Sequence, residues 1–218
     1  MNDPSRRHGL ADDAQRTMQA VALIRLGARL QVVEIECALP RDRLARLYRE
    51  VRGVAAPKGL LPSSTDWYMT WFANLHASLF HGIYRFLRNE AGCSRLDALI
   101  KAYTLYAEHG DSADVALPLD LTRAWMLVRF IDGGVLDTAP CAHCGASFIT
   151  YRHALRHHPI CVACRLPSRA GKRTVRAPAR VDPVAQSALR SRGRTTIASR
   201  CEGGPAASRE WQGERDAG

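Results

Sequence analysis

Four cysteines in the C-terminal half of the chain have a spacing that is typical of a metal site. They form two C-x2-C pairs, Cys141 with Cys144 and Cys161 with Cys164, separated by sixteen residues. This is the spacing of a tetrahedral zinc site, in which each pair forms a knuckle and both thiolates point at one metal. Four thiolates fill the coordination sphere and leave no position for water. We therefore expect one structural Zn²⁺ and no metal-based hydrolysis.

Other uses of the cysteines are weaker interpretations of the same spacing. Two disulfides are disfavoured in a reducing cytoplasm, and a thioredoxin-like redox pair would need one motif beside a strand and a helix. An iron–sulfur cluster also takes four cysteines, and spacing alone leaves it open. A nearby histidine could replace one thiolate, although four cysteines already suffice. The histidines in question are His143, His153, His157 and His158.

The cysteines lie in a short, turn-rich stretch, residues 135–167, with β-type residues at 148–151. A segment of this size cannot bury enough apolar surface to fold alone, so it needs a metal as a cross-link. Cationic side chains in and just after it suit a surface that contacts phosphates. The candidates are Arg152, Arg156, His157, Arg165, Arg169 and Lys172.

The residues before this module, which must position it, have the apolar spacing of helices. Apolar side chains recur at helical spacing over most of residues 14–134, beginning with Ala20, Leu23 and Ile24. A helix expected over residues 66–89 carries its most apolar side chains along one face, which the pattern predicts to be core. That face consists of Phe72, Leu75, Leu79, Ile83, Phe86 and Leu87.

Residues 28–52 resemble a helix-turn-helix, with a break at Ala38–Leu39–Pro40. Proline cannot continue a helix but is accepted at the start of the next one. Glycine is usual in such a turn, and Ala38 stands there instead. The second helix places arginines opposite its apolar side, as a helix facing phosphates would, although an ordinary surface helix has the same pattern. The DNA-contact candidates here are Arg43, Arg46 and Arg49.

Charge and composition bound the remaining interpretations. The 218 residues carry a net charge of +10, and residues 165–218 account for +7 of it. Most of this last stretch is rich in Arg, Pro, Ser, Ala and Gly and has little to bury, so we expect a disordered basic tail over residues 168–218. No dinucleotide, Walker, zinc-protease or serine-hydrolase motif is present, so we expect no enzyme. The sequence lacks an apolar segment long enough to span a bilayer and an evident secretion signal, so we expect a cytoplasmic protein.

Several strings occur together in the order known from one family. They are LIRLGARLQVVEIECALPRDRLARLYREVRG, PKGLLPSSTDWYMTWFANLHASLF, IYRFLRNEAG, LTRAWMLVRFIDGGVL, the paired CxxC motifs and SRAGK at residues 168–172. From about residue 18 to Lys172 the chain resembles the FlhC family of flagellar transcriptional regulators. The stretch after residue 173 has no counterpart in this resemblance.

The resemblance implies a function and partners. Members of this family form a hetero-oligomer, expected here to be a heterohexamer, with an FlhD-like subunit; the complex binds promoter DNA and engages RNA polymerase. The family's four zinc-binding cysteines correspond to Cys141, Cys144, Cys161 and Cys164. An alternative function is that of a zinc-ribbon protein that binds RNA or supports assembly without reading DNA sequence.

The expected fold is mainly α: a helical domain with a helix-turn-helix-like segment, then a small zinc-ribbon-like module, then a disordered basic tail. The expected segments are a flexible N-terminus over 1–13, a helical oligomerisation and DNA-binding domain over 14–134, the zinc module over 135–167 and the tail over 168–218.

Overall fold

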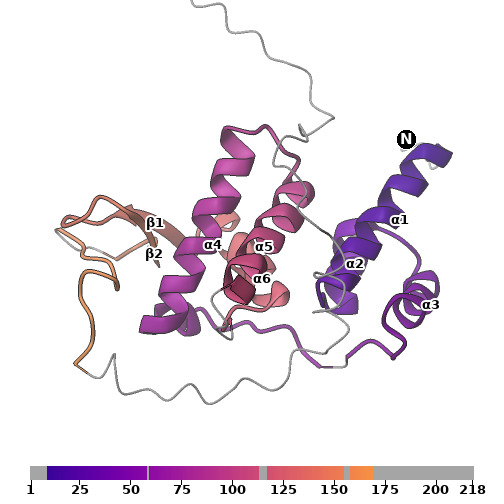
Figure 1. The fold of residues 1–218 in the computed structure, drawn as a ribbon, viewed down its shortest axis with the longest axis horizontal. Coiled ribbons are helices and arrows are strands. Elements are labelled where there is room, and N and C mark those ends of the chain that lie inside the picture. Colours follow the sequence, from indigo (N-terminus) through magenta and orange to yellow (C-terminus); the bar gives the residue numbers. More distant parts are fainter. Residues whose placement is uncertain (1–8, 58, 113–116, 155–157, 169–218) are drawn as a thin grey trace, which may run out of the picture.

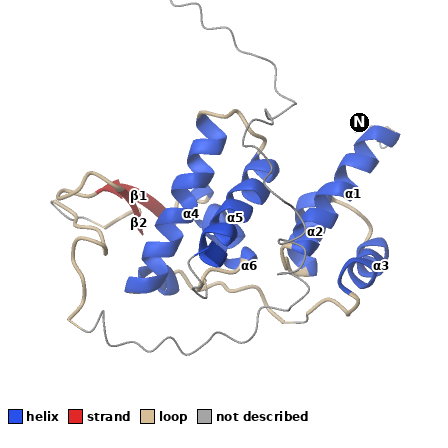
Figure 2. Cartoon of the chain, viewed as in Figure 1, coloured by secondary structure: helices blue, strands red, loops and turns tan. Residues whose placement is uncertain are grey.

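The computed structural model describes residues 9–57, 59–112, 117–154 and 158–168. Within these residues the fold is mostly helical, as predicted, with a small antiparallel hairpin near the end (Figure 2). The elements in chain order are α1 (Leu10–Arg25), α2 (Leu30–Cys37), α3 (Arg41–Arg52), the 3-10 helix η1 (Asp66–Met69), α4 (Trp71–Asn89), α5 (Arg95–Ser112), α6 (Leu121–Asp132), β1 (Leu136–Pro140) and β2 (Ser147–Tyr151).

The elements form three groups along the long axis of the molecule (Figure 1). Helices α1, α2 and α3 form one end, α4, α5 and α6 the middle, and the β1–β2 hairpin the other end. The buried apolar residues of both helical groups belong to one continuous core. The helix-turn-helix-like segment and the four-cysteine module therefore lie at opposite ends of the molecule.

Helix α1 begins earlier than the sequence indicated. It begins at Leu10, so residues 10–13 are helical where we expected a flexible terminus. Asp12 and Asp13 occupy its first turn, where carboxylates interact favourably with the partial positive charge of a helix N-terminus. Residues 1–8 of the expected flexible stretch lie outside the described residues. The predicted core stripe is confirmed, with Ala20, Leu23 and Ile24 fully buried.

The two short helices expected around Pro40 are present as α2 and α3. Val33 and Cys37 before the break, Leu39 within it and Leu44 after it are all buried. Ala38 ends α2 in the left-handed conformation, with φ 50° and ψ 35°. Pro40 precedes the first residue of α3 with φ −57°, a value that proline prefers. The turn is therefore built with an alanine where its backbone favours glycine.

Replacing Ala38 by glycine tests this strain. Ala38→Gly should stabilise the protein by up to about 1 kcal/mol, because the left-handed conformation penalises a side chain with a Cβ. Urea unfolding of the two proteins measures the difference. Ala45→Gly in the interior of α3 is the matched control and should destabilise by about 1 kcal/mol. Equal destabilisation by both substitutions would contradict the expectation.

Helix α4 buries only part of the face that was predicted: Ile83 and Leu87 pack against the core, but the larger part of the buried surface lies on a neighbouring face. Leu75, Leu79 and Phe86 are 36%, 43% and 60% exposed. The face turned inward packs against η1, α5 and β2, and it combines alanines and polar residues with aromatic rings. Asn74 on this face donates from its side chain to the carbonyls of Tyr68 and Ile149. The buried residues are Ala73, Asn74, Ala77, Phe80, His81 and Tyr84.

Because His81 is buried on this face, we expect the stability of the fold to depend on pH. Desolvation, reinforced by Arg85, lowers the pKa of His81 to about 4, against 6.5 for an ordinary histidine. Between these values the unfolded chain binds the proton and the folded protein does not, so stability falls as the pH falls. The loss across this window is about 3 kcal/mol. His81→Gln should remove it, which urea unfolding at pH 7 and pH 4.5 would measure.

The control for this prediction is His109→Gln, because His109 is exposed on α5. Protonation of other groups over the same window affects wild type and variants alike, so it cancels in the comparison. The pH dependence of His109→Gln should stay closer to that of wild type than the pH dependence of His81→Gln does; a small difference is expected because His109 contributes to the lowered pKa of His76. A pH dependence of His81→Gln that matches wild type would contradict the assignment.

Candidate metal centre

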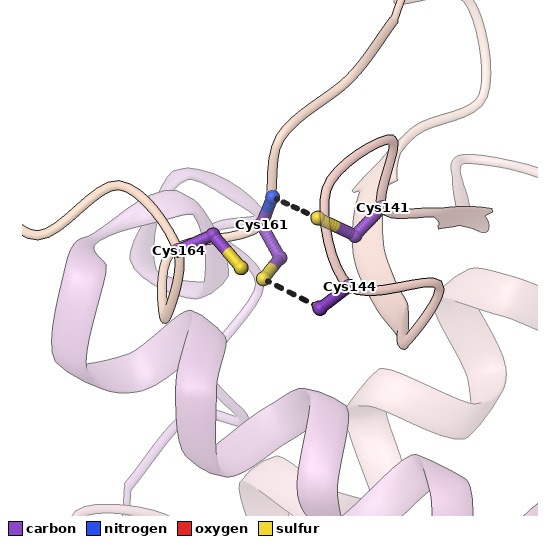
Figure 3. A group of neighbouring side chains, drawn as sticks. All are labelled: Cys141, Cys144, Cys161 and Cys164. Atoms are coloured by element: carbon purple, nitrogen blue, oxygen red, sulfur yellow. Dashed lines mark hydrogen bonds between the residues drawn. The ribbon is translucent and has the colours of Figure 1, made fainter.

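The four predicted cysteines meet at one point beyond the hairpin (Figure 3). Their sulfur atoms all lie within 4.8 Å of one another, and among the described residues no histidine or carboxylate joins the group. Cys141 and Cys161 are each 4% exposed, while Cys144 and Cys164 are more accessible. The sequence prediction that these residues gather is therefore confirmed.

The arrangement has the dimensions of a site for one metal ion. With metal–sulfur bonds of about 2.3 Å, the sulfurs of a tetrahedral site lie about 3.8 Å apart. The Sγ atoms of Cys144 and Cys161 are 3.8 Å apart. Four sulfur donors in this geometry suit zinc or iron. The residues present thus fit a metal, and they offer it a fully occupied sphere.

Backbone N–H groups stabilise the thiolate form of Cys141 in the first knuckle, which is the form that binds a cation. The N–H groups of Cys161 and His143 donate to the Cys141 sulfur at 3.3 and 3.4 Å. Backbone N–H groups, that of Cys161 foremost and then that of Cys144, lower the pKa of the Cys141 thiol to about 6. Neighbouring sulfurs, that of Cys144 foremost, raise the pKa of Cys164 to about 12. A divalent cation between them would offset the repulsion that full ionisation of the cluster entails.

The hairpin carries the first knuckle. Leu136 to Pro140 pair with Tyr151 to Ser147 in antiparallel register, and Cys141 follows β1 directly. The Cys141 N–H donates to the Ala146 carbonyl at 2.9 Å, so the knuckle closes the hairpin. Gly134, with φ 68°, makes the left-handed turn that leads from α6 into β1.

Helix α4 and η1 support the module with polar side chains that the sequence did not single out. Ile149 in β2 is held on both sides of its backbone: its N–H donates to Ser78 Oγ and its carbonyl accepts from Asn74 Nδ2. The Trp71 indole N–H donates to the Val162 carbonyl at 2.9 Å. Tyr151 donates from its hydroxyl to Asp66. Helical periodicity counts apolar residues, so it passes over such contacts.

The DNA-contact candidates of α3 differ in what they touch. Arg43 makes a two-pronged ion pair with Asp13 of α1, at 2.9 and 3.0 Å. Hydrogen bonding to Asp13 raises the pKa of Arg43, whose charge is thus already balanced. Arg46 and Arg49 are exposed on the same helix.

The module's candidates lie at the far end of the molecule from α3. Arg152 follows β2 and Arg165 follows the second knuckle, and both are exposed. The structure thus does not bring the two sets of arginines together (Figure 1). Arg156, His157, Arg169 and Lys172 lie outside the described residues, as does the predicted tail from residue 169 onward.

Two further findings bear on the kind of protein. Within the part of the chain that the structure describes, no helix combines the length and the apolarity needed to cross a membrane. The model of the family described as flagellar transcriptional activator (FlhC) matches residues 6–177.

Individual proteins agree with the family match. A flagellar transcriptional regulator FlhC from Burkholderia lata is 68% identical over the whole of both chains. The protein of that name from Paraburkholderia phymatum is 54% identical over 83% of this chain and 82% of its own. The one from Serratia marcescens is 47% identical over 81% of this chain and 92% of its own. The chain belongs to the FlhC family of flagellar transcriptional regulators.

Proposed function

We propose that the chain is the DNA-binding subunit of an activator of flagellar promoters, working with an FlhD-like partner and RNA polymerase. The observation that carries this proposal is the family match over residues 6–177, which includes the helical body and all four cysteines. The cysteines hold one structural Zn²⁺, which supplies a cross-link between two knuckles and no chemistry of its own. Catalysis forms no part of the proposed function.

The sulfur geometry favours a single ion over a cluster, and the resemblance to the FlhC family favours zinc as that ion. Sulfurs within 4.8 Å of one another surround a space for one ion. An iron–sulfur cluster of several irons would hold its thiolates farther apart, since the irons and sulfides lie between them. Metal analysis of the purified chain should find about one zinc per molecule.

The exposed apolar face of α4 supports the proposal of a partner subunit. Leu75, Leu79 and Phe86 lie on one side of this helix and are at least one-third exposed. A row of large apolar side chains in water is typical of a surface that another protein covers. We propose that the FlhD-like subunit contacts this row in a hetero-oligomer, with a heterohexamer as the expected stoichiometry.

The end of the molecule that carries the metal is our proposed DNA surface. Arg152 and Arg165 are exposed there without a carboxylate partner among the described residues, whereas Arg43 on α3 is paired with Asp13. Guanidinium groups of this kind bind phosphates and release counterions, so affinity should fall steeply with salt. Arg46 and Arg49 form the second candidate surface, at the opposite end.

The test is co-expression with the FlhD-like subunit, followed by a footprint on a flagellar promoter and a salt titration. We expect protection of the promoter by the complex, with at least about 10³-fold preference over random duplex. Arg152→Gln with Arg165→Gln should reduce the salt slope by about 2. Arg46→Gln with Arg49→Gln is the matched pair, and a reduced slope there instead would place the DNA on α3. Equal affinity for promoter, random duplex and single strands would favour the RNA-binding alternative.

A further inference from the structure

The two knuckles of the metal site are held in different ways. The first follows β1 directly, and the Pro140–Ser147 pair of the sheet fixes its start. The second knuckle, Cys161 to Cys164, comes well after β2 ends at Tyr151 and belongs to no strand. Its link to the first knuckle includes the Ala142 N–H, which donates to the Pro159 carbonyl at 2.8 Å. A knuckle without a strand needs other contacts to fix its orientation.

Helix α4 provides such a contact through its first residue. The indole N–H of Trp71 donates to the carbonyl of Val162, which lies between the two cysteines of the second knuckle. The same helix holds β2 at Ile149 through Asn74 and Ser78. One helix therefore holds both the hairpin that carries the first knuckle and the backbone of the second.

The Val162 peptide lies in the turn that joins the two cysteines of the second knuckle. The turn it belongs to is closed by the N–H groups of Cys164 and Arg165, which donate to the Cys161 carbonyl at 3.2 and 3.0 Å. Rotation of the Val162 peptide would turn Cys161 and Cys164 away from the common centre. Contacts that orient metal ligands in advance raise metal affinity, and their loss typically costs 10- to 100-fold.

We propose that Trp71 is a positioning residue for the metal site: its indole N–H fixes the Val162 carbonyl and thereby aims Cys161 and Cys164 at the ion. This inference rests on the metal site proposed above. The metal affinity of the module would then depend directly on the helical body, since Trp71 belongs to α4 and not to the module.

The test uses Co²⁺ as the probe in the full-length chain, because cobalt bound by four thiolates gives visible bands that report on ligand geometry. Trp71→Phe keeps a ring and removes only the donor. It should bind Co²⁺ about tenfold more weakly in competition with a chelator, with altered visible bands. Trp71→His places a ring N–H at the same distance from the backbone and should recover part of the affinity.

Trp67→Phe is the matched control. Trp67 lies in η1, where its ring packs on Tyr68 and under the Arg123 guanidinium at 4.2 Å. Its substitution should leave the cobalt affinity and bands unchanged. Wild-type affinity and bands in Trp71→Phe would overturn the inference, and so would equal weakening by both substitutions. Absence of thiolate-type bands in the wild-type chain would instead refute the metal site itself.

If Trp71→Phe loses helix content by circular dichroism, Trp71→His decides the question. Recovery of both the helix content and the cobalt affinity supports the role of the N–H. Recovery of the helix content alone, with the affinity still low, overturns it.

Discussion

Cys161→Ser should abolish stoichiometric metal binding and unfold the end of the hairpin. Cys161 is almost fully buried, and its backbone N–H also donates to the Cys141 sulfur at 3.3 Å. A serine hydroxyl is a poor zinc ligand at neutral pH, so one corner of the tetrahedron is lost. Because metal binding supplies much of the folding free energy of so small a module, we expect a loss of several kcal/mol. Metal analysis and hydrogen exchange over residues 136–151 measure both effects.

Cys37→Ala is the control for Cys161→Ser. Cys37 is a buried free thiol in α2, far from the metal centre, and burial raises its pKa to about 11, so it stays neutral. Its replacement should cost about 1 kcal/mol through lost packing and leave the metal content unchanged. Normal metal content in Cys161→Ser would contradict the assignment of Cys161 as a ligand.

The Cys161→Ser variant also tests whether the four-cysteine module contacts DNA. If the module contacts promoter DNA, loss of its fold should remove the contribution of Arg152 and Arg165 to binding. We expect promoter affinity of the complex to fall by at least about tenfold, since two phosphate contacts are lost. Full promoter affinity in a metal-free Cys161→Ser complex would refute a role of the module in DNA binding.

Local patterns in the sequence predict the elements of this fold well and their packing less well. The break at Ala38–Leu39–Pro40 separates α2 from α3 because proline constrains the chain locally. The inward face of α4 depends on distant partners. Both sides of this helix carry apolar residues, and Asn74 can be a core residue because the backbones of η1 and β2 supply acceptors for its amide. The periodicity of one helix does not show which distant elements will contact it.

For the candidate site, too, the sequence predicts some residues and not others: it predicts the metal ligands but not the residues that support them. Spacing identifies Cys141, Cys144, Cys161 and Cys164, because two short turns and one metal restrict the possible separations. The supports of the site come from far along the chain: Trp71 precedes its acceptor Val162 by 91 positions. Likewise Arg43, one of the expected DNA contacts, pairs with Asp13, and helical phase alone could not show this pairing.

Glu36→Ala should be among the most destabilising substitutions in the helical body. The Glu36 carboxylate is only 10% exposed and accepts from Arg95 at 2.8 Å and from the Trp125 indole at 2.6 Å. Its removal leaves the indole N–H of a fully buried tryptophan without this acceptor and takes one partner from Arg95. We expect a loss of about 2 kcal/mol in urea unfolding, mainly from the buried indole N–H left without its acceptor, because the Arg95 side chain is 37% exposed and water can solvate it.

Glu34→Ala on the same helix is the matched control. Glu34 pairs with Arg41 at the same 2.8 Å, but both side chains are exposed, at 38% and 64%. Water and salt screen such a pair, so its loss should cost less than about 1 kcal/mol. Equal costs for the two substitutions would contradict the role assigned to burial.

The difference between these variants has a consequence for the architecture. Glu36 lies in α2, Arg95 at the start of α5 and Trp125 in α6, and Arg95 also pairs with Asp132 at 3.2 Å. This cluster joins the helix-turn-helix-like end to the helices that lead to the metal. Glu36→Ala should therefore raise hydrogen exchange in α2 and α3 more than in β1 and β2, since the hairpin keeps its contacts with α4. Uniform acceleration across all elements would show instead that the two ends unfold as one unit.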